Sequence, residues 1–292
     1  MLHKTSLALN KNTTPAFAKS KIITIVKLAI ICTGGGMRCA YSGGALVALA
    51  KEFHITTPDI TIGVSGGAGS LAYYLAGQYE DIERIWTELL ATKKFIEFRL
   101  RKPILDIDYL IDTVFKKQAP LDTERIMSSS TDWFFPATDI HTQKQSRFFS
   151  KNNSLDIFEI LRASMAVPFI YGKRILLEGF DYQDGDLGLT IEDSIAKARS
   201  LGATHIIVIE SHQENFRVRF IDKFFKNKFK KSEIYRPSKN NDAPLFIIRI
   251  RNTHSPAGLL TRDKNKLRAT FNKGYDEMVA HHELRAFPSQ LH

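Results

Sequence analysis

The chain has 292 residues, of which 43% are hydrophobic and 25% charged, a balance typical of a globular protein with a sizeable core. Its two cysteines, Cys32 and Cys39, form neither a zinc-binding spacing nor a disulfide framework, which favours a reduced, cytoplasmic setting. The net charge of +10 favours acidic partners, either an anionic lipid surface or nucleic acid, although an ordinary basic surface explains it equally well. No recognised nucleic-acid-binding module accompanies the charge, so we expect no nucleic-acid partner.

The N-terminal segment 1–20 is polar and lacks a continuous apolar run, so we expect a disordered tail and no secretory signal. No apolar run reaches the ~18 residues that a membrane-spanning helix requires. The best candidate, Ile22–Cys32, is short and is interrupted by Lys27, which is typical of a buried strand. We find no repeat and no long linker, and therefore expect one domain over residues 21–292.

Short apolar runs then alternate with helical patterns, which predicts an α/β fold, a three-layer α/β/α arrangement with a mostly parallel central sheet. The predicted strands are Leu28–Cys32, Ile60–Val64, Trp133–Ala137, Arg147–Phe149, Ile175–Leu177, His205–Glu210 and Leu245–Ile250. The predicted helices are Tyr41–Phe53, Ala68–Ala76, Ile157–Met165, Ile191–Ser200 and Asp263–His281. Residues 79–126 interrupt the alternation, and we expect them to form an all-helical insertion that acts as a lid or substrate wall.

A second interruption lies between the last two strands, where residues 216–242 are rich in Lys, Arg and Phe. Within it, residues 216–231 carry phenylalanines at helical spacing with basic residues between them. Basic charge with exposed aromatic rings suits docking on an anionic membrane surface. An ordinary helix with its phenylalanines in the core fits the same pattern, and both interpretations stand.

The most informative motif is Gly-Val-Ser-Gly-Gly at 63–67, between a predicted strand and a predicted helix. In a G-x-S-x-G turn the serine hydroxyl projects from the top of the sheet, above the positive end of the following helix. The flanking glycines are needed because a Cβ at either place would collide with a neighbouring element. The motif therefore predicts that Ser65 is an enzymatic nucleophile.

A glycine run, Thr-Gly-Gly-Gly-Met-Arg at 33–38, directly follows the first predicted strand. Successive glycines let backbone N–H groups approach an anion, either a phosphate or a developing oxyanion. A dinucleotide fingerprint fails because Cys39 stands where the third glycine belongs, and Gly-Lys-Arg at 172–174 does not complete a Walker loop. An oxyanion site is therefore preferred, with a purely structural turn as the alternative.

A third motif is Tyr-Gln-Asp-Gly-Asp at 182–186, which we expect after a strand and a turn and before a helix. By itself an Asp-Gly pair indicates a plain β-turn. However, the motifs at 34–38, 63–67 and 184–185, in this order, resemble those of the patatin-like phospholipases. Leu-Arg-Ala-Ser-Met-Ala-Val-Pro at 161–168 also resembles a block of that family, and the resemblance extends from about residue 22 to residue 275.

The resemblance implies a lipid acyl hydrolase of the phospholipase A or lysophospholipase type, which needs no metal or organic cofactor. Its substrate would be a phospholipid or lysophospholipid, and the enzyme would be cytoplasmic or peripherally bound to membrane. A catalytic Ser–Asp dyad is implied, in which Ser65 attacks the ester carbonyl and Asp184 accepts its proton. The implied oxyanion and substrate-binding residues are Gly34, Gly35, Gly36, Arg38 and Gly66.

The chain departs from the family pattern at two positions. Cys39 replaces a glycine, and Asp186 stands where a small residue usually follows Asp-Gly. A second carboxylate beside the base could raise the pKa of Asp184 or crowd the site. Three alternatives therefore stay open: a lipid-binding protein with a vestigial site, an acyltransferase, and a Ser–Asp–His triad that uses His212 in preference to His205.

Overall fold

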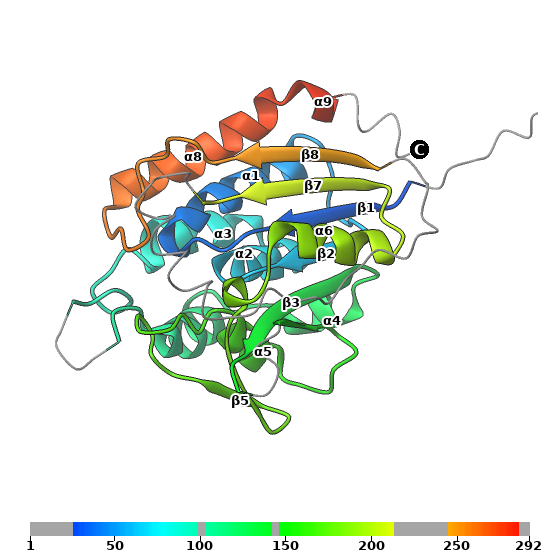
Figure 1. The fold of residues 1–292 in the computed structure, drawn as a ribbon. Coiled ribbons are helices and arrows are strands. Elements are labelled where there is room, and N and C mark those ends of the chain that lie inside the picture. The colour runs from blue at the N-terminus through cyan, green and yellow to red at the C-terminus, as the bar shows by residue number, and fades with distance from the viewer. Residues whose placement is uncertain (1–25, 99–102, 142–145, 213–244, 286–292) are drawn as a thin grey trace, which may run out of the picture.

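A sheet of eight strands forms the centre of the computed structural model, which describes residues 26–98, 103–141, 146–212 and 245–285 (Figure 1). The strands are β1 (Leu28–Cys32), β2 (Ile60–Gly63), β3 (Asp132–Asp139), β4 (Ser146–Phe149), β5 (Ile175–Leu177), β6 (Phe180–Asp184), β7 (His205–Glu210) and β8 (Phe246–Arg251). Their order is β5-β6-β3-β2-β1-β7-β8, with β4 also paired to β3. The tail 1–20 and the basic stretch 216–231 lie outside the described residues.

The sheet is parallel from β3 through β2, β1 and β7 to β8, as expected. Antiparallel pairing is confined to one side, where β4 and β6 pair with β3 and β5 pairs with β6. The strands that follow β1 in the sequence, β2 and β3, lie on one side of it in the sheet, whereas β7 and β8 lie on its other side. The carboxyl end of β1 is therefore a topological switch point, where open α/β sheets bind ligands.

Helices cover both faces of the sheet, which confirms the predicted three-layer architecture (Figure 1). Alternate residues of β1 face opposite layers, so Ile30 packs in one hydrophobic cluster and Ile31 in the other. The first layer contains α1 (Ala40–Lys51), α2 (Gly66–Leu75) and α8 (Lys264–Ala280), and the second contains α6 (Ile191–Ser200). The remaining helices are η1 (Gly36–Cys39), α3 (Tyr79–Arg84), η2 (Ile85–Leu89), η3 (Tyr109–Gln118), α4 (Thr123–Ser128), α5 (Ile157–Ser164), η4 (Gly185–Leu187) and α9 (His282–Arg285).

Two expectations about local structure were wrong. The segment 79–126 is not all-helical, because turns and an isolated bridge between Ile96 and Leu105 separate η2 from η3. The region before Asp184 is a strand, β6, where only a turn was expected. No apolar run marks β6 in the sequence, because its buried residues are Tyr-Gln-Asp. The strand forms because its backbone groups pair with those of β3.

A cluster of ion pairs connects the segment 79–126 to α5. The Arg162 side chain is only 8% exposed and donates to Asp108 at 2.5 Å and to Asp112 at 2.9 Å, both next to or within η3. It also bonds Glu159 on its own helix at 3.2 Å. Because a buried guanidinium without partners is costly, these contacts fix the position of η3 against the body of the protein.

Candidate active site

Ser65 occupies a strained turn between β2 and α2. Its backbone has φ 53° and ψ −128°, in a region that non-glycine residues rarely adopt. A Cβ on Gly63 would lie 2.7 Å from Ala68 Cα, and one on Gly67 would lie 2.7 Å from the carbonyl oxygen of Cys32. The two glycines therefore permit the close strand–helix approach that presents the serine, and such strain concentrates at functional sites.

The Ser65 hydroxyl meets Asp184 directly. Ser65 Oγ donates to Asp184 Oδ2 at 2.7 Å, and both residues are buried. Asp184 is the last residue of β6 and lies beside Ala137 of β3. Its other carboxylate oxygen, Oδ1, accepts the Asp186 N–H at 2.9 Å, so both oxygens are held in place. Two residues 119 positions apart in sequence are thus joined by the pairing of β6 with β3.

The environment of Asp184 favours its protonated form. Burial raises the pKa of this carboxyl far above its ordinary value, and the nearby Asp186 carboxylate raises it further. The hydrogen bonds from the Ser65 hydroxyl and the Asp186 N–H act in the opposite direction but do not cancel the rise. Once ionised, a carboxyl whose pKa is raised in this way is a stronger base than an ordinary aspartate and is suited to take a proton from a serine hydroxyl.

The glycine run lies beside the serine, between β1 and α1. Gly36 has φ 57°, and a Cβ there would lie 2.7 Å from the carbonyl oxygen of Leu259. A Cβ on Gly34 would lie 2.9 Å from the Ser65 Cβ. Gly66 is the first residue of α2, a position whose N–H has no acceptor within the helix. The structure therefore places Gly34 against Ser65, and Gly36 and Gly66 line the same pocket as Ser65.

Arg38 and Cys39 pack beneath this loop. The Arg38 side chain is buried, and its Nε donates to the carbonyl oxygen of Gly35 at 3.0 Å. This contact fits a role in positioning the loop. Cys39 is also buried, and a Cβ on Gly66 would lie 2.8 Å from its Sγ, so a compact thiol fits where the family pattern has glycine.

His212 does not adopt a triad geometry. Its Nε2 lies 3.3 Å from Asp186 Oδ2, whereas the hydroxyl of Ser65 donates to Asp184 without an intervening imidazole. A Ser–His–Asp triad requires the imidazole between the serine and the carboxylate. His212 is therefore part of the site's surroundings, next to Asp186.

Sequence reasoning missed the groups that support the dyad. The Ser65 N–H donates to Ser164 Oγ at 3.2 Å, and the Asp184 N–H donates to the carbonyl oxygen of Ala166 at 3.1 Å. Both partners lie in the segment 161–168, which carried part of the family resemblance. That motif signalled the location, but the contacts themselves depend on α5 packing beside both motifs.

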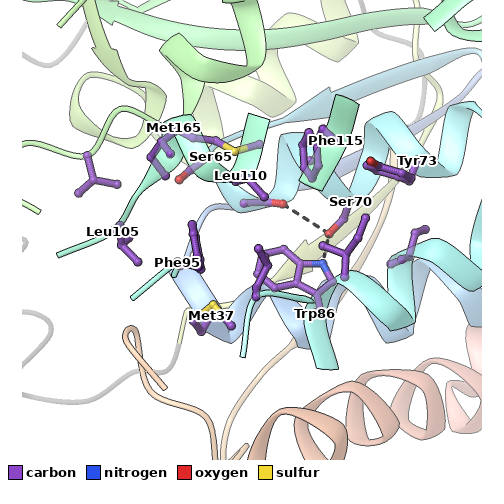
Figure 2. A pocket seen from close by; sticks show the side chains of 18 residues that line it. Met37, Ser65, Ser70, Tyr73, Trp86, Phe95, Leu105, Leu110, Phe115 and Met165 are labelled. Atoms are coloured by element: carbon purple, nitrogen blue, oxygen red, sulfur yellow. Dashed lines mark hydrogen bonds between the residues drawn. The ribbon is translucent and has the colours of Figure 1, made fainter. Parts of the chain in front are cut away.

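An apolar pocket opens at Ser65 (Figure 2). Its wall is built by residues of η1, α2, α3, η2 and η3, by the segment between η2 and η3, and by Met165 and Val167 after α5. Trp86 Nε1 donates to Ser70 Oγ at 2.9 Å, which fixes the indole in the wall. Aliphatic, aromatic and methionine side chains supply most of the lining, including Met37, Tyr73, Ile82, Ile85, Trp86, Leu90, Phe95, Leu105, Ile107, Leu110, Phe115, Met165 and Val167.

In the ranges that the structure describes, no group of three or more His, Cys, Asp or Glu side chains is placed to hold a metal ion. Within the same ranges, none of the helices is both long enough and apolar enough to span a membrane.

The fold and the site together define an α/β protein with a serine–aspartate pair at a strand-to-helix elbow. The family model "Patatin-like phospholipase" matches residues 30–190, more than half of the chain. The chain therefore belongs to the patatin-like phospholipase family, which confirms the resemblance found in its motifs.

The individual proteins that resemble this chain share only low sequence identity with it. The uncharacterized protein YjjU of Escherichia coli (strain K12) is 26% identical over 192 residues, covering 63% of this chain and 52% of YjjU. This chain thus spans about half the length of that curated relative. VipD from Legionella pneumophila aligns over 88% of this chain and 67% of its own, with TM-score 0.47 and 11% identity. Human GIVD cytosolic phospholipase A2 aligns over 92% and 60%, with TM-score 0.45 and 13% identity.

Proposed function

We propose that this protein is a serine acyl hydrolase that cleaves carboxylic ester bonds of phospholipids or lysophospholipids through a Ser65–Asp184 dyad. The observation that carries the proposal is the 2.7 Å hydrogen bond from Ser65 Oγ to the buried Asp184 carboxyl, at the mouth of an apolar pocket. A nucleophile within hydrogen-bond reach of a base is the signature of covalent catalysis. Membership of the patatin-like phospholipase family supports a lipid ester as the substrate.

In the first half of the reaction, the acyl chain lies in the apolar pocket and its carbonyl carbon faces Ser65 Oγ. Ionised Asp184 takes the hydroxyl proton as Oγ attacks, and the carbonyl oxygen becomes an oxyanion. The backbone N–H groups of Gly35, Gly36 and Gly66 stabilise that charge, and loss of one such donor commonly costs ~10²–10³ in rate. The intermediate then collapses, and Asp184 returns the proton to the departing alcohol.

The second half releases the acyl group. Asp184, ionised again, takes a proton from a water molecule, which attacks the ester carbonyl of the acyl-enzyme. A second oxyanion forms in the same glycine loop and collapses to break the bond to Ser65 Oγ. Asp184 gives its proton back to the serine, the fatty acid leaves, and the enzyme is restored without any cofactor.

The test combines covalent labelling with turnover. The protein would be incubated with a fluorophosphonate probe and with phospholipid, lysophospholipid and p-nitrophenyl esters. Ser65→Ala should abolish labelling, and both Ser65→Ala and Asp184→Asn should reduce hydrolysis by at least about 10³-fold. Ser128→Ala, at the exposed end of α4, is the matched serine control and should label and turn over like the parent.

Several results would contradict the proposal. Labelling that persists in Ser65→Ala, or hydrolysis unchanged in Asp184→Asn, would refute the dyad. Lipid binding to vesicles without labelling or hydrolysis would identify a binding protein with a vestigial site. Acyl transfer to an added alcohol, with little free fatty acid, would identify an acyltransferase.

Peripheral membrane contact is tested separately. Salt-sensitive vesicle binding that is lost when the basic residues of 217–231 are removed would support such contact.

A further inference from the structure

A second carboxyl group lies against the dyad. The Asp186 N–H donates to Asp184 Oδ1 at 2.9 Å, and its Oδ2 lies 3.3 Å from His212 Nε2. The same oxygen fills the space above the glycine run, since a Cβ on Gly34 would lie 2.1 Å from it. Asp186 therefore contacts the base, the oxyanion loop and an imidazole at once.

The two carboxyl groups have different surroundings. Asp184 is only 4% exposed, whereas the Asp186 side chain is 34% exposed. Asp186 and His212 line a second cavity, at the carboxyl end of β1 beneath the start of α6, together with Thr33, Thr190 and Ser194. A carboxylate that is partly solvated and hydrogen-bonded keeps its charge, and a neighbouring buried carboxyl then holds its proton more tightly.

The tautomer of His212 is consistent with a negative charge on Asp186. Arg38 Nη2 lies 3.3 Å from His212 Nδ1, and a guanidinium can only donate. Nδ1 is therefore the acceptor, so Nε2 carries the proton and donates it to Asp186 Oδ2. Arg38, His212 and Asp186 form a chain of hydrogen bonds that begins at the Gly35 carbonyl oxygen and ends beside the dyad.

Other polar groups around Asp184 do not supply negative charge. Burial raises the pKa of the Cys39 thiol to about 12, so it is neutral. Ser65 contributes a hydroxyl donor, and His212 lies within hydrogen-bond distance of Asp186. Among the described residues, Asp186 is the carboxylate whose charge raises the pKa of Asp184, whereas Glu210 at the end of β7 pairs with Arg249 and Arg251.

We propose that Asp186 is a positioning residue that sets the pH range of the reaction: its carboxylate, held by His212 and placed against Asp184, disfavours a second negative charge on the base. Activation of the serine then requires a more alkaline medium. The inference rests on the proposed function, because it concerns the base of the same dyad. It assigns a role to one of the two residues at which this chain departs from the family pattern.

The test is the pH dependence of kcat/KM in Asp186→Asn. This change keeps the side-chain volume and the N–H donor to Asp184 but removes the charge. The acid limb of the profile should shift downward by about 1 pH unit or more. Glu192→Gln is the matched control, since it removes a carboxylate that lines the same cavity and pairs with Arg249 away from the dyad, and its acid limb should not move. Asp186→Ala provides a second variant if Asp186→Asn folds poorly.

A direct titration separates failure of this inference from failure of the proposed function. Carboxyl ¹³C NMR of aspartate-labelled protein follows Asp184 without any turnover, with Asp184→Asn used to assign its resonance. Titration at lower pH in Asp186→Asn supports the inference even if the protein hydrolyses no ester. Hydrolysis with unchanged titration and an unchanged acid limb would overturn the inference and leave the dyad intact. An equal loss of kcat at every pH would show that Asp186 is only structural.

Discussion

Asp184 has a strongly raised pKa although it receives hydrogen bonds that favour its ionised form. It is buried beside a second carboxylate, which raises its pKa, and it receives two hydrogen bonds that hold its geometry. Because the folded protein retains this proton while the unfolded chain releases it above pH ~4, stability falls as pH rises toward the folded-state pKa. The proposed base therefore weakens the fold under the conditions in which it works.

Asp184→Asn should stabilise the protein while it abolishes hydrolysis. Asparagine cannot ionise, yet its amide can donate to Ser65 Oγ and its oxygen can accept the Asp186 N–H. We expect a gain of about 1–2 kcal/mol at pH 8 and a much smaller gain at pH 5, where the parent still holds its proton. Thermal unfolding at both pH values measures it. Equal destabilisation at both would show that burial of the Asp184 charge carries no cost.

At the scale of elements, the apolar pocket at Ser65 depends on helices that depart from α geometry. η2 and η3 are π-helices, a rare winding that is frequent at functional sites. η2 places Ile85 and Trp86 in the pocket wall, and the bond from Trp86 to Ser70 ties that wall to α2. The size of the side chains on η2 should therefore limit the length of acyl chain that fits.

Trp86→Leu should shift the preferred p-nitrophenyl ester toward longer acyl chains, because it opens space beside Ser70. The same change should cost about 2–4 kcal/mol of stability, since a buried indole is truncated and its hydrogen bond is lost. Initial rates across a series of chain lengths measure the shift. Leu89→Ala, on the same helix but not in the pocket lining, is the control and should leave the preference unchanged. An unaltered preference in Trp86→Leu would place the acyl chain elsewhere.

For the whole molecule, α1 packs closely against α8, which brings the N-terminal and C-terminal parts of the described chain into contact. A Cβ on Gly44 would lie 1.9 Å from the carbonyl oxygen of Phe271, and one on Gly274 would lie 2.0 Å from that of Tyr41. The two helices therefore meet backbone to backbone at paired glycines. This contact holds α8 against α1 (Figure 1).

Gly274→Ala should destabilise the protein by about 1–3 kcal/mol or more, because the added methyl must push a rigid backbone away. Denaturant unfolding measures the loss. Asn272→Ala, on the exposed side of α8, is the matched control and should change stability by less than about 0.5 kcal/mol. A stable Gly274→Ala variant would mean that α8 can shift without consequence.

Features that depend on local sterics and hydrophobic periodicity could be predicted from the amino-acid sequence. Buried parallel strands appear as continuous apolar runs, and the elbow and glycine run are visible because only glycine tolerates such close backbone approach. These features predicted the α/β class, confirmed here, and identified Ser65 and residues 34–36 as candidates, whereas Asp184 was implied only by the family resemblance of its Asp-Gly motif. The family block at 161–168 pointed to the segment that supports them.

Features that depend on pairing between distant segments became visible only in the folded chain. β6 carries polar residues that become buried because β3 satisfies their backbone, so no apolar pattern marks it. The break in the expected helical insertion and the contact of Asp186 with His212 also arise from packing across the fold. Burial and hydrogen bonding of a carboxyl are set by its neighbours in space, and sequence separation carries no information about them.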